Sequence, residues 1–143
     1  MIYTELTKKA MKIAFAAHEG QKDKSGLPYI NHPLHVAEQM NDEDTCVVAL
    51  LHDVAEDSDI TIEELEKEGF TEAQIEAVRL MTHNKNVPYL DYVKNLSTNR
   101  IAKTVKLADI EHNSDLTRLS NADEDDISRN RDKYEAAYKI LMP

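Results

Sequence analysis

Apolar residues recur every three or four positions along nearly the whole chain, which is the spacing of helices with one buried face. In the first segment Leu6, Ala10 and Ile13 keep this spacing, and Thr4 stands where a helix N-cap is expected. Gly20 to Tyr29 interrupts the pattern with glycine, proline and charged residues, so an irregular loop is predicted there. The chain therefore begins with a helix followed by a loop.

The same spacing, together with capping residues and helix breakers, predicts helices over most of the remaining chain. They run from about Pro33 to Met40, through Cys46, from Thr61 to Gly69, from Thr71 to Met81, from Pro88 to Leu96, onward from Asn99, and from Ile127 to Leu141. Asn121 to Asp126 is acidic and is expected to form a turn or a helix start. No alternating run is long enough to predict a sheet. We therefore predict an all-α fold in which residues 1–143 form a single domain.

The segment from Cys46 to Asp59 combines an apolar stretch with a cluster of charges. Its first six residues are apolar or small, and they lead directly into His52, Asp53, Glu56 and Asp57. On a continuous helix His52 and Glu56 share one face, with Asp53 and Asp57 on the adjacent strip. Burial of one imidazole and three carboxylates without a partner is very costly in free energy. The segment therefore indicates a cation among these side chains or a water-filled cleft above them.

Composition and charge restrict the classes of function. The net charge of −10 argues against a general nucleic-acid binder, which needs a basic surface to meet phosphates. The longest apolar run is far too short to cross a bilayer, and the N-terminal residues lack the apolar core of a signal peptide. We therefore expect a cytoplasmic protein without membrane association. Cys46 is the only cysteine, which excludes a disulfide framework and a thiolate metal cluster within this sequence.

Side chains of the types that bind metals gather at three places in the sequence. These places are Asn31-His32-Pro33, His52-Asp53 with Glu56-Asp57, and Asp109 with Asn113. Imidazoles and carboxylates together form a donor set that suits a six-coordinate divalent ion such as Mn²⁺, and zinc binds such a set as well. Taken alone, His52 can be a satisfied core histidine. Asp109 can simply pair with Lys106 or Arg118.

Taken together, the three places carry motifs in a specific order. The motifs are Ala17–Ala37 (AHEGQKDKSGLPYINHPLHVA), Ala49–Thr61 (ALLHDVAEDSDIT) and Lys106–Leu116 (KLADIEHNSDL). In order and spacing they resemble the HD-domain hydrolases of the RelA/SpoT type, and most of all the stand-alone small alarmone hydrolases. The resemblance extends from about Leu6 to Leu141 and implies an HD-domain helical bundle.

The resemblance also implies roles for individual residues. The four metal ligands, usually of Mn²⁺ in this family, match His32, His52, Asp53 and Asp109. The acidic pair that orients or deprotonates the attacking water matches Glu56 and Asp57. The substrate-binding positions match Lys24, Ser25, Tyr29, Asn113 and, in a C-terminal stretch that meets phosphates, Arg131 and Tyr134.

The implied activity is hydrolysis of a small nucleotide, the guanosine tetra- or pentaphosphate alarmone, at its 3′-diphosphate. Where the family usually has an arginine that packs on the guanine base, this chain has Asp23, which favours an alternative substrate such as a nucleotide cofactor with a 2′- or 3′-phosphate. A second alternative is a regulatory module that binds a nucleotide without turnover, although the pair Glu56 and Asp57 argues against it. The sequence does not determine the oligomeric state, and a homo-oligomer is compatible with it.

Overall fold

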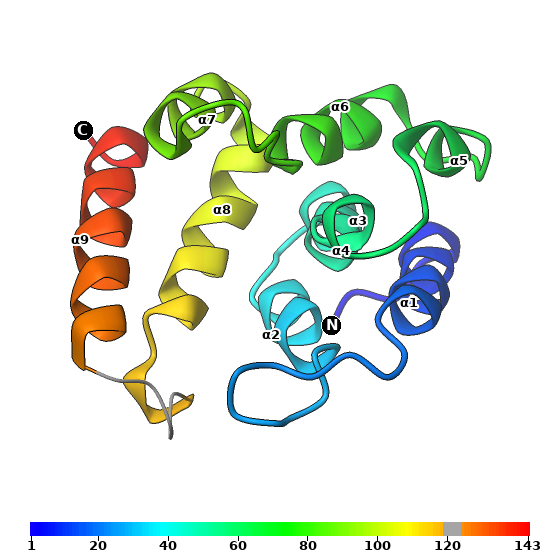
Figure 1. Ribbon diagram of the computed structural model, residues 1–143. Coiled ribbons are helices and arrows are strands. Elements are labelled where there is room, and N and C mark those ends of the chain that lie inside the picture. Colours follow the sequence, from blue (N-terminus) through cyan, green and yellow to red (C-terminus); the bar gives the residue numbers. More distant parts are fainter. Residues whose placement is uncertain (119–123) are drawn as a thin grey trace.

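The computed structural model describes residues 1–118 and 124–143, and within these ranges it is built of helices. In chain order they are α1 (Glu5–Ala17), α2 (Asn31–Glu38), α3 (Glu43–Leu51), α4 (Val54–Asp57), α5 (Ile62–Glu66), α6 (Glu72–Met81), α7 (Tyr89–Leu96), α8 (Arg100–Asn113), the 3₁₀ turn η1 (Leu116–Arg118) and α9 (Glu124–Leu141). Extended pairing within the described residues is limited to one isolated bridge between Lys22 and Pro28. The predicted all-α fold is confirmed (Figure 1). None of the described helices combines the length and the apolar character needed to cross a membrane.

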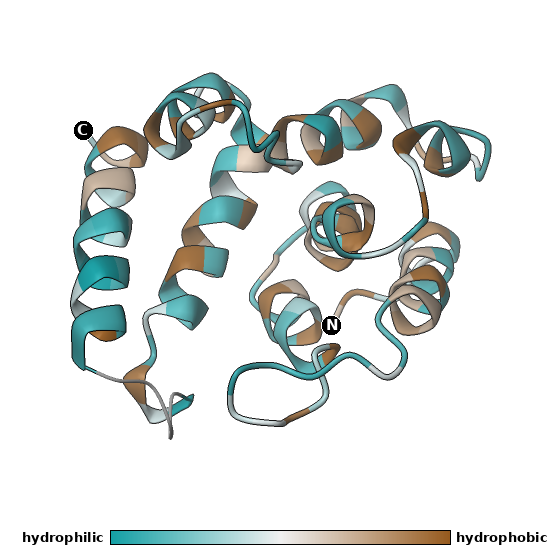
Figure 2. Cartoon of the chain, in the orientation of Figure 1, coloured by the Kyte–Doolittle hydropathy of each residue, from teal (hydrophilic) through white to brown (hydrophobic). Residues whose placement is uncertain are grey.

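Helix α3 forms the centre of the fold. Every side chain from Thr45 to Leu51 is buried. Because this segment is apolar on all sides, it needs cover on all sides, and α1, α2, α6 and α8 pack around it (Figure 1). Figure 2 shows hydrophobic positions on α3 and on the inward sides of the helices around it. Since α3 ends at Leu51, its packing fixes the position of the residues that follow, His52 and Asp53.

Several predicted helix starts are confirmed by capping hydrogen bonds. Thr4 and Thr71 each accept a hydrogen bond from the backbone N–H three residues further on, and each forms a complete capping box. The Asn99 side chain caps α8 in the same way. These bonds satisfy backbone donors that a helix start otherwise leaves unpaired.

Two predicted boundaries fall in different places from the described helices. Helix α2 starts at Asn31, slightly before the predicted start at Pro33. Helix α9 is described from Glu124 onward, and residues 121–123 of the predicted acidic turn lie outside the described residues.

The expectation of one continuous helix through His52 and Glu56 is wrong. Helix α3 ends at Leu51, and the short helix α4 starts after Asp53. His52 Nδ1 lies 2.6 Å from the carbonyl oxygen of Ala49, which is the acceptor that the Asp53 N–H uses when a helix continues. The φ of −102° and ψ of −2° at Asp53 depart from ideal helical values. The break therefore lies at His52 and Asp53, between α3 and α4.

Candidate metal centre

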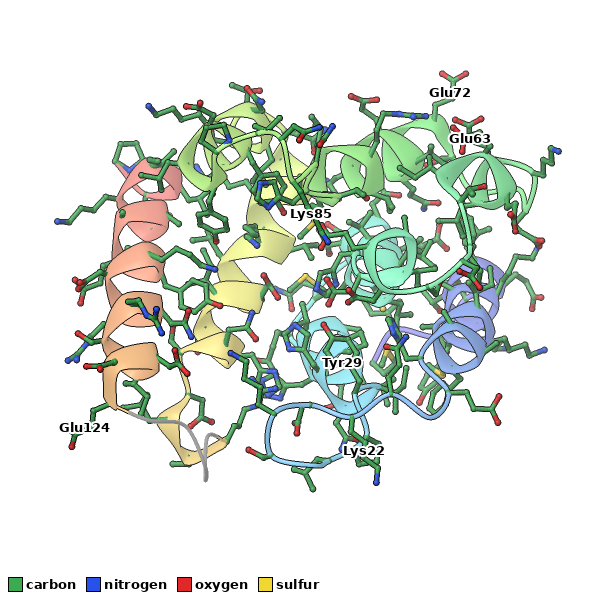
Figure 3. The ribbon with its side chains drawn as sticks, viewed as in Figure 1. Lys22, Tyr29, Glu63, Glu72, Lys85 and Glu124 are labelled. Carbon is green, nitrogen blue, oxygen red and sulfur yellow. The ribbon has the colours of Figure 1, made fainter. Side chains whose placement is uncertain are left out.

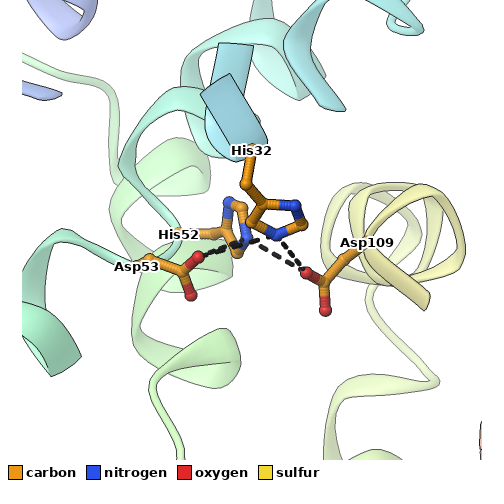
Figure 4. Close-up of side chains that lie close together, drawn as sticks. All are labelled: His32, His52, Asp53 and Asp109. Carbon is orange, nitrogen blue, oxygen red and sulfur yellow. Dashed lines mark hydrogen bonds and ion pairs between the residues drawn. The ribbon is translucent and has the colours of Figure 1, made fainter. Parts of the chain in front are cut away.

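Four side chains from three parts of the chain meet in the interior of the fold. His32 comes from the first turn of α2, His52 and Asp53 from the break after α3, and Asp109 from α8. Their ligand atoms all lie within 4.8 Å of one another (Figure 4). His32 Nε2 lies 2.8 Å from Asp109 Oδ1, and His52 Nε2 lies 3.1 Å from Asp53 Oδ2. The structure thus brings together all four residues that were predicted as metal ligands.

The hydrogen bonding of His52 fits a bound cation. Because a carbonyl oxygen only accepts, the contact with Ala49 requires the proton on His52 Nδ1. In the neutral ring, Nε2 then presents its lone pair to the carboxylates of Asp53 and Asp109, and Nε2 is buried without a hydrogen-bond partner among the described residues. Such lone pairs repel one another unless a positive charge lies between them. Two imidazoles and two carboxylates therefore fit a divalent ion of borderline or hard character, of which Mn²⁺ is one.

The charges of the cluster show the same preference for a cation. Burial opposes a charge on His52, but Asp53 and Asp109 raise the pKa of His52 well above its ordinary value. Burial also acts to raise the pKa of Asp109, but Lys106 and the two imidazoles hold the pKa of Asp109 well below its ordinary value. Asp109 therefore stays a carboxylate, which is the form that binds a metal ion.

Each carboxylate of the cluster is oriented by further contacts. Lys106 Nζ lies 2.9 Å from Asp109 Oδ2, and Asn113 Nδ2 donates to Asp109 Oδ1 at 3.2 Å. The Tyr29 hydroxyl donates to Asp53 Oδ2 at 2.7 Å, and Figure 3 places Tyr29 toward the middle of the molecule. Hydrogen bonds of this kind fix the direction of metal-binding groups. Tyr29 and Asn113, which were predicted to contact substrate, thus lie directly against predicted metal ligands.

The His32 ring is oriented by His112, which in turn stacks on His35. His32 Nδ1 lies 2.7 Å from Nδ1 of His112, and the His112 ring stacks on His35 with 3.9 Å between the ring centroids. Burial and the charge of Arg118 lower the pKa of His112 to about 4, so this ring is neutral near pH 7. A neutral His112 can accept the Nδ1 proton of His32, which leaves His32 Nε2 free to bind a metal ion.

The predicted acidic pair lies on α4 beside the cluster. Glu56 Oε1 accepts a hydrogen bond from the backbone N–H of His83, and the Asp57 backbone carbonyl accepts one from Gln21 Nε2 at 2.6 Å. Both residues are exposed, yet partial burial of each carboxylate raises its pKa, and the negative charge of Asp53 raises it further. A carboxylate with a raised pKa is a stronger proton acceptor, which suits a general base.

A cavity of about 270 Å³ opens next to the cluster. Its lining includes His32 and five of the predicted substrate-binding residues, namely Lys24, Ser25, Tyr29, Asn113 and Tyr134. Arg118 and Asn130 line it as well, and the sequence motifs did not identify them. Asn130 could have been found from its place four residues before Tyr134, on the same helix face. No sequence signal marked Arg118, which lies in η1.

Arg131 lines a second cavity and not the one beside the His–Asp cluster, whereas Asn113 and Tyr134 line both. It lines a larger space of about 790 Å³ between α8 and α9, together with Ile110 and Tyr138. Within the described residues, the side chain of Arg131 is therefore not part of the cavity beside the His–Asp cluster.

Asp23 shapes the loop that forms one side of the smaller cavity. Its Oδ1 accepts hydrogen bonds from the backbone N–H groups of Ser25 at 2.9 Å and Leu27 at 3.0 Å. The Ser25 hydroxyl in turn donates to the backbone carbonyl of Arg118, so the loop is tied to η1. The carboxylate of Asp23 is thus engaged by the backbone of its own loop.

Comparison with known sequences relates the chain to one family. The family model described as HD domain matches residues 10–112. The zebrafish (Danio rerio) guanosine-3′,5′-bis(diphosphate) 3′-pyrophosphohydrolase is 37% identical over 132 residues, which cover 82% of this chain and 72% of that protein. The Aquifex aeolicus protein of the same activity name is 40% identical over 91 residues, 61% of this chain and 13% of that protein. A putative chloroplastic GTP diphosphokinase of Arabidopsis thaliana is 45% identical over 69 residues, 45% of this chain and 8% of that protein.

A solved structure has the same fold. It is that of a metazoan orthologue of SpoT described as hydrolysing ppGpp, and it matches 99% of this chain and 88% of its own with a TM-score of 0.84 and 24% identity. The helical bundle predicted from the three motifs is therefore confirmed. The chain spans 13% or less of the Aquifex and Arabidopsis relatives, so the shared region is one part of those long proteins.

Proposed function

The chain belongs to the HD-domain family, and on that basis we propose that it is a divalent-metal-dependent pyrophosphohydrolase of guanosine tetra- and pentaphosphate. One water is consumed and the 3′-diphosphate is released, giving GDP or GTP and pyrophosphate. The zebrafish relative carries the name of this reaction, at 37% identity over 82% of the chain. The observation that supports the proposal most directly is the cluster of four ligand atoms within 4.8 Å of one another, three of them from buried residues.

In the proposed reaction one divalent ion, for which Mn²⁺ is our candidate, is held by His32, His52, Asp53 and Asp109. An ion of this kind polarises phosphoryl oxygens and lowers the pKa of water. Glu56 accepts a proton from the attacking water, and Asp57 beside it helps to orient that water. Lys24, which lines the cavity, offsets negative charge on the diphosphate as it leaves.

The test is turnover of guanosine tetraphosphate by the purified protein with Mn²⁺, beside an EDTA control and a panel of other phosphorylated nucleotides. We expect pyrophosphate release that EDTA abolishes and added Mn²⁺ restores. Phosphate release from another nucleotide, with guanosine tetraphosphate untouched, would contradict the proposed substrate while keeping the metal mechanism. Absence of turnover across the panel, with metal bound, would contradict the enzyme and favour a nucleotide-binding module.

A second candidate is a metal-dependent phosphohydrolase that acts on another nucleotide, such as a cofactor with a 2′- or 3′-phosphate. The observation that favours it is Asp23, whose carboxylate accepts hydrogen bonds from Ser25 and Leu27 and offers no cation to stack on a guanine base. The nucleotide panel separates the two candidates, because only the first releases pyrophosphate from guanosine tetraphosphate.

A further inference from the structure

The backbone N–H of His83 points away from the helix that precedes it. Helix α6 ends at Met81, and Thr82 follows with an extended backbone, at a φ of −81° and a ψ of 106°. In a continuing helix the His83 N–H would bond the carbonyl of Arg79, four residues earlier. That carbonyl instead accepts from the N–H of Thr82 at 3.2 Å. The His83 N–H is therefore released from α6, and it donates to Oε1 of Glu56 on α4.

The imidazole of His83 is fixed by two contacts with the segment that follows α6. Its Nε2 lies 2.7 Å from the carbonyl oxygen of Val87, and because a carbonyl only accepts, Nε2 carries the proton. The ring also stacks on that of Tyr92, on α7, with 4.5 Å between the ring centroids. The hydroxyl of Tyr92 donates to the carbonyl of Met81 at 2.7 Å, and Tyr92 is buried. The His83 ring therefore anchors its own backbone to α7.

The contact with His83 distinguishes the two carboxylate oxygens of Glu56. Oε1 accepts from the His83 N–H, and within the described ranges Glu56 makes no other hydrogen bond or ion pair through its side chain. An exposed glutamate otherwise samples many rotamers. One bond to a fixed backbone donor restricts this freedom and leaves Oε2 as the oxygen that can take up a proton. A general base must lie within hydrogen-bond reach of the proton that it removes, so this donor bears on catalysis.

We propose that His83 is a positioning residue for the general base. Its ring, held by Val87 and Tyr92, fixes its N–H, and the N–H holds Glu56 with Oε2 free for the attacking water. This inference rests on the proposed function and deepens it, because it assigns the orientation of the base to a side chain outside the metal ligands and outside the lining of the cavity beside them. The effect of His83 should therefore fall on kcat and not on KM.

The test compares three variants of the full chain with metal bound. His83→Ala removes both ring contacts and keeps the N–H. His83→Gln keeps a donor at about the reach of Nε2, so it can still bond the carbonyl of Val87. His83→Pro removes the N–H itself, and the extended backbone of Thr82 is of the kind that a residue before proline adopts. Lys85→Ala removes an exposed lysine from the same loop and is the matched control.

Steady-state kinetics use the substrate that the nucleotide panel identifies. We expect His83→Ala to lower kcat about tenfold and to change KM by about twofold or less, because misplacement of a catalytic group costs rate more than affinity. His83→Gln should recover most of the loss, and His83→Pro should lose at least as much as His83→Ala. In the Glu56→Gln background His83→Ala should lower kcat no further, since no base is left to position. An unchanged kcat of His83→Ala, or an equal loss in the Glu56→Gln background, would overturn the inference.

Hydrogen exchange of the amide of residue 83 tests the positioning without turnover. It is measured by NMR with Zn²⁺, a diamagnetic ion that this donor set also binds, and is corrected for the intrinsic rate of each residue type. Glu56→Ala removes the acceptor and calibrates the loss. We expect His83→Ala to lose about tenfold in protection, since a hydrogen bond to a charged acceptor is worth at least that factor. His83→Gln should lose less, and Lys85→Ala should match the wild type.

An unprotected amide in the wild type would overturn the inference, and so would equal protection in the wild type and His83→Ala. The proposed function is judged separately, by turnover of the wild type. If no nucleotide is hydrolysed while the protection depends on the His83 ring, the proposed function fails and the positioning of Glu56 stands. If hydrolysis occurs and kcat does not depend on His83, only the present inference fails.

Discussion

Lys106 Nζ lies 2.9 Å from Asp109 Oδ2, in an ion pair whose residues are only 8% and 5% exposed. The pair leaves Asp109 Oδ1 to face the imidazoles of His32 and His52. Lys106 therefore decides which carboxylate oxygen is available for a metal ion, and it supplies positive charge to Asp109 when no ion is bound. A buried pair of this kind is strongly destabilised when one partner is removed, because the other charge stays buried alone.

The first prediction concerns this pair. Lys106→Met removes the ammonium and leaves Asp109 buried, so the metal-free protein should lose about 3 kcal/mol of unfolding free energy. With Mn²⁺ bound the loss should be smaller, since the ion places positive charge beside Asp109. Urea unfolding in EDTA and in Mn²⁺ measures both values. Lys103→Met, one turn earlier on α8 and half-buried, is the control. Equal losses with and without Mn²⁺ would contradict the placing of the ion at Asp109.

The second prediction separates metal binding from catalysis. Glu56→Gln keeps the shape and the acceptor oxygen that meets the His83 N–H but removes the base. Turnover should fall by about 100-fold or more, which is the usual contribution of a general base. The Mn²⁺ content, measured by elemental analysis, should stay at the wild-type level. Asp53→Asn is the contrasting variant and should lose bound metal along with turnover. Full activity of Glu56→Gln would remove Glu56 from the mechanism.

That His32, His52, Asp53 and Asp109 lie together could be predicted from the sequence, in part because some of the information is local. His52 and Asp53 follow a segment that is apolar on every side, so their burial could be inferred from the chain itself. His32 and Asp109 could be assigned because the three motifs occur in the order and spacing of a known family. The helix break at Asp53 could not be inferred, since it depends on the His52 ring taking the carbonyl of Ala49 from the continuing helix.

The substrate pocket was harder to predict because it depends on contacts between distant segments. Arg118 reaches the pocket through a hydrogen bond between its backbone carbonyl and Ser25, which is far away in sequence. Asn130 and Tyr134 reach it through the docking of α9 on α7 and α8. Helical periodicity gives the faces of α9, but it does not say which face meets the loop at Lys24.

The third prediction concerns the loop at Asp23. Because Asp23 Oδ1 accepts from the backbone N–H groups of Ser25 and Leu27, its role is to hold the loop conformation. Asp23→Asn keeps that acceptor, so the KM for the nucleotide should change by about twofold or less. Asp23→Arg supplies the arginine that is usual in the family but loses both bonds, so its KM should rise several-fold. Steady-state kinetics on the substrate found in the nucleotide panel measures both. A lower KM for Asp23→Arg would contradict this prediction, because it would show that an arginine contact with the guanine base lowers KM more than the loss of the two loop hydrogen bonds raises it.

The last prediction gives a pH dependence of stability that is carried by Asp42 at the start of α3. Asp42 Oδ1 accepts from the Thr45 N–H and from the Thr45 hydroxyl, each at 2.8 Å, and Oδ2 lies 3.5 Å from Arg100. These hydrogen bonds, followed by the charge of Arg100, lower the pKa of Asp42 below its ordinary value of 3.8. A carboxyl group with a depressed folded-state pKa stabilises the fold fully above its unfolded-state pKa. That contribution is lost as the pH falls through the lower folded-state pKa.

Asp42→Asn keeps the cap but carries no charge, so it isolates the ionic part of this contribution. Because Asp42 is largely exposed and the charges are screened, the difference in unfolding free energy between the two proteins should be only about 0.5 kcal/mol at pH 7. It should remain at pH 5 and shrink toward zero below pH 3.8, where the wild-type carboxyl takes up its proton. Urea unfolding of both proteins in EDTA across this range measures the difference, and Asp59→Asn, at an exposed carboxylate, is the control. A difference that stays constant from pH 7 to pH 3 would show that the charge of Asp42 does not stabilise the helix that leads into His52.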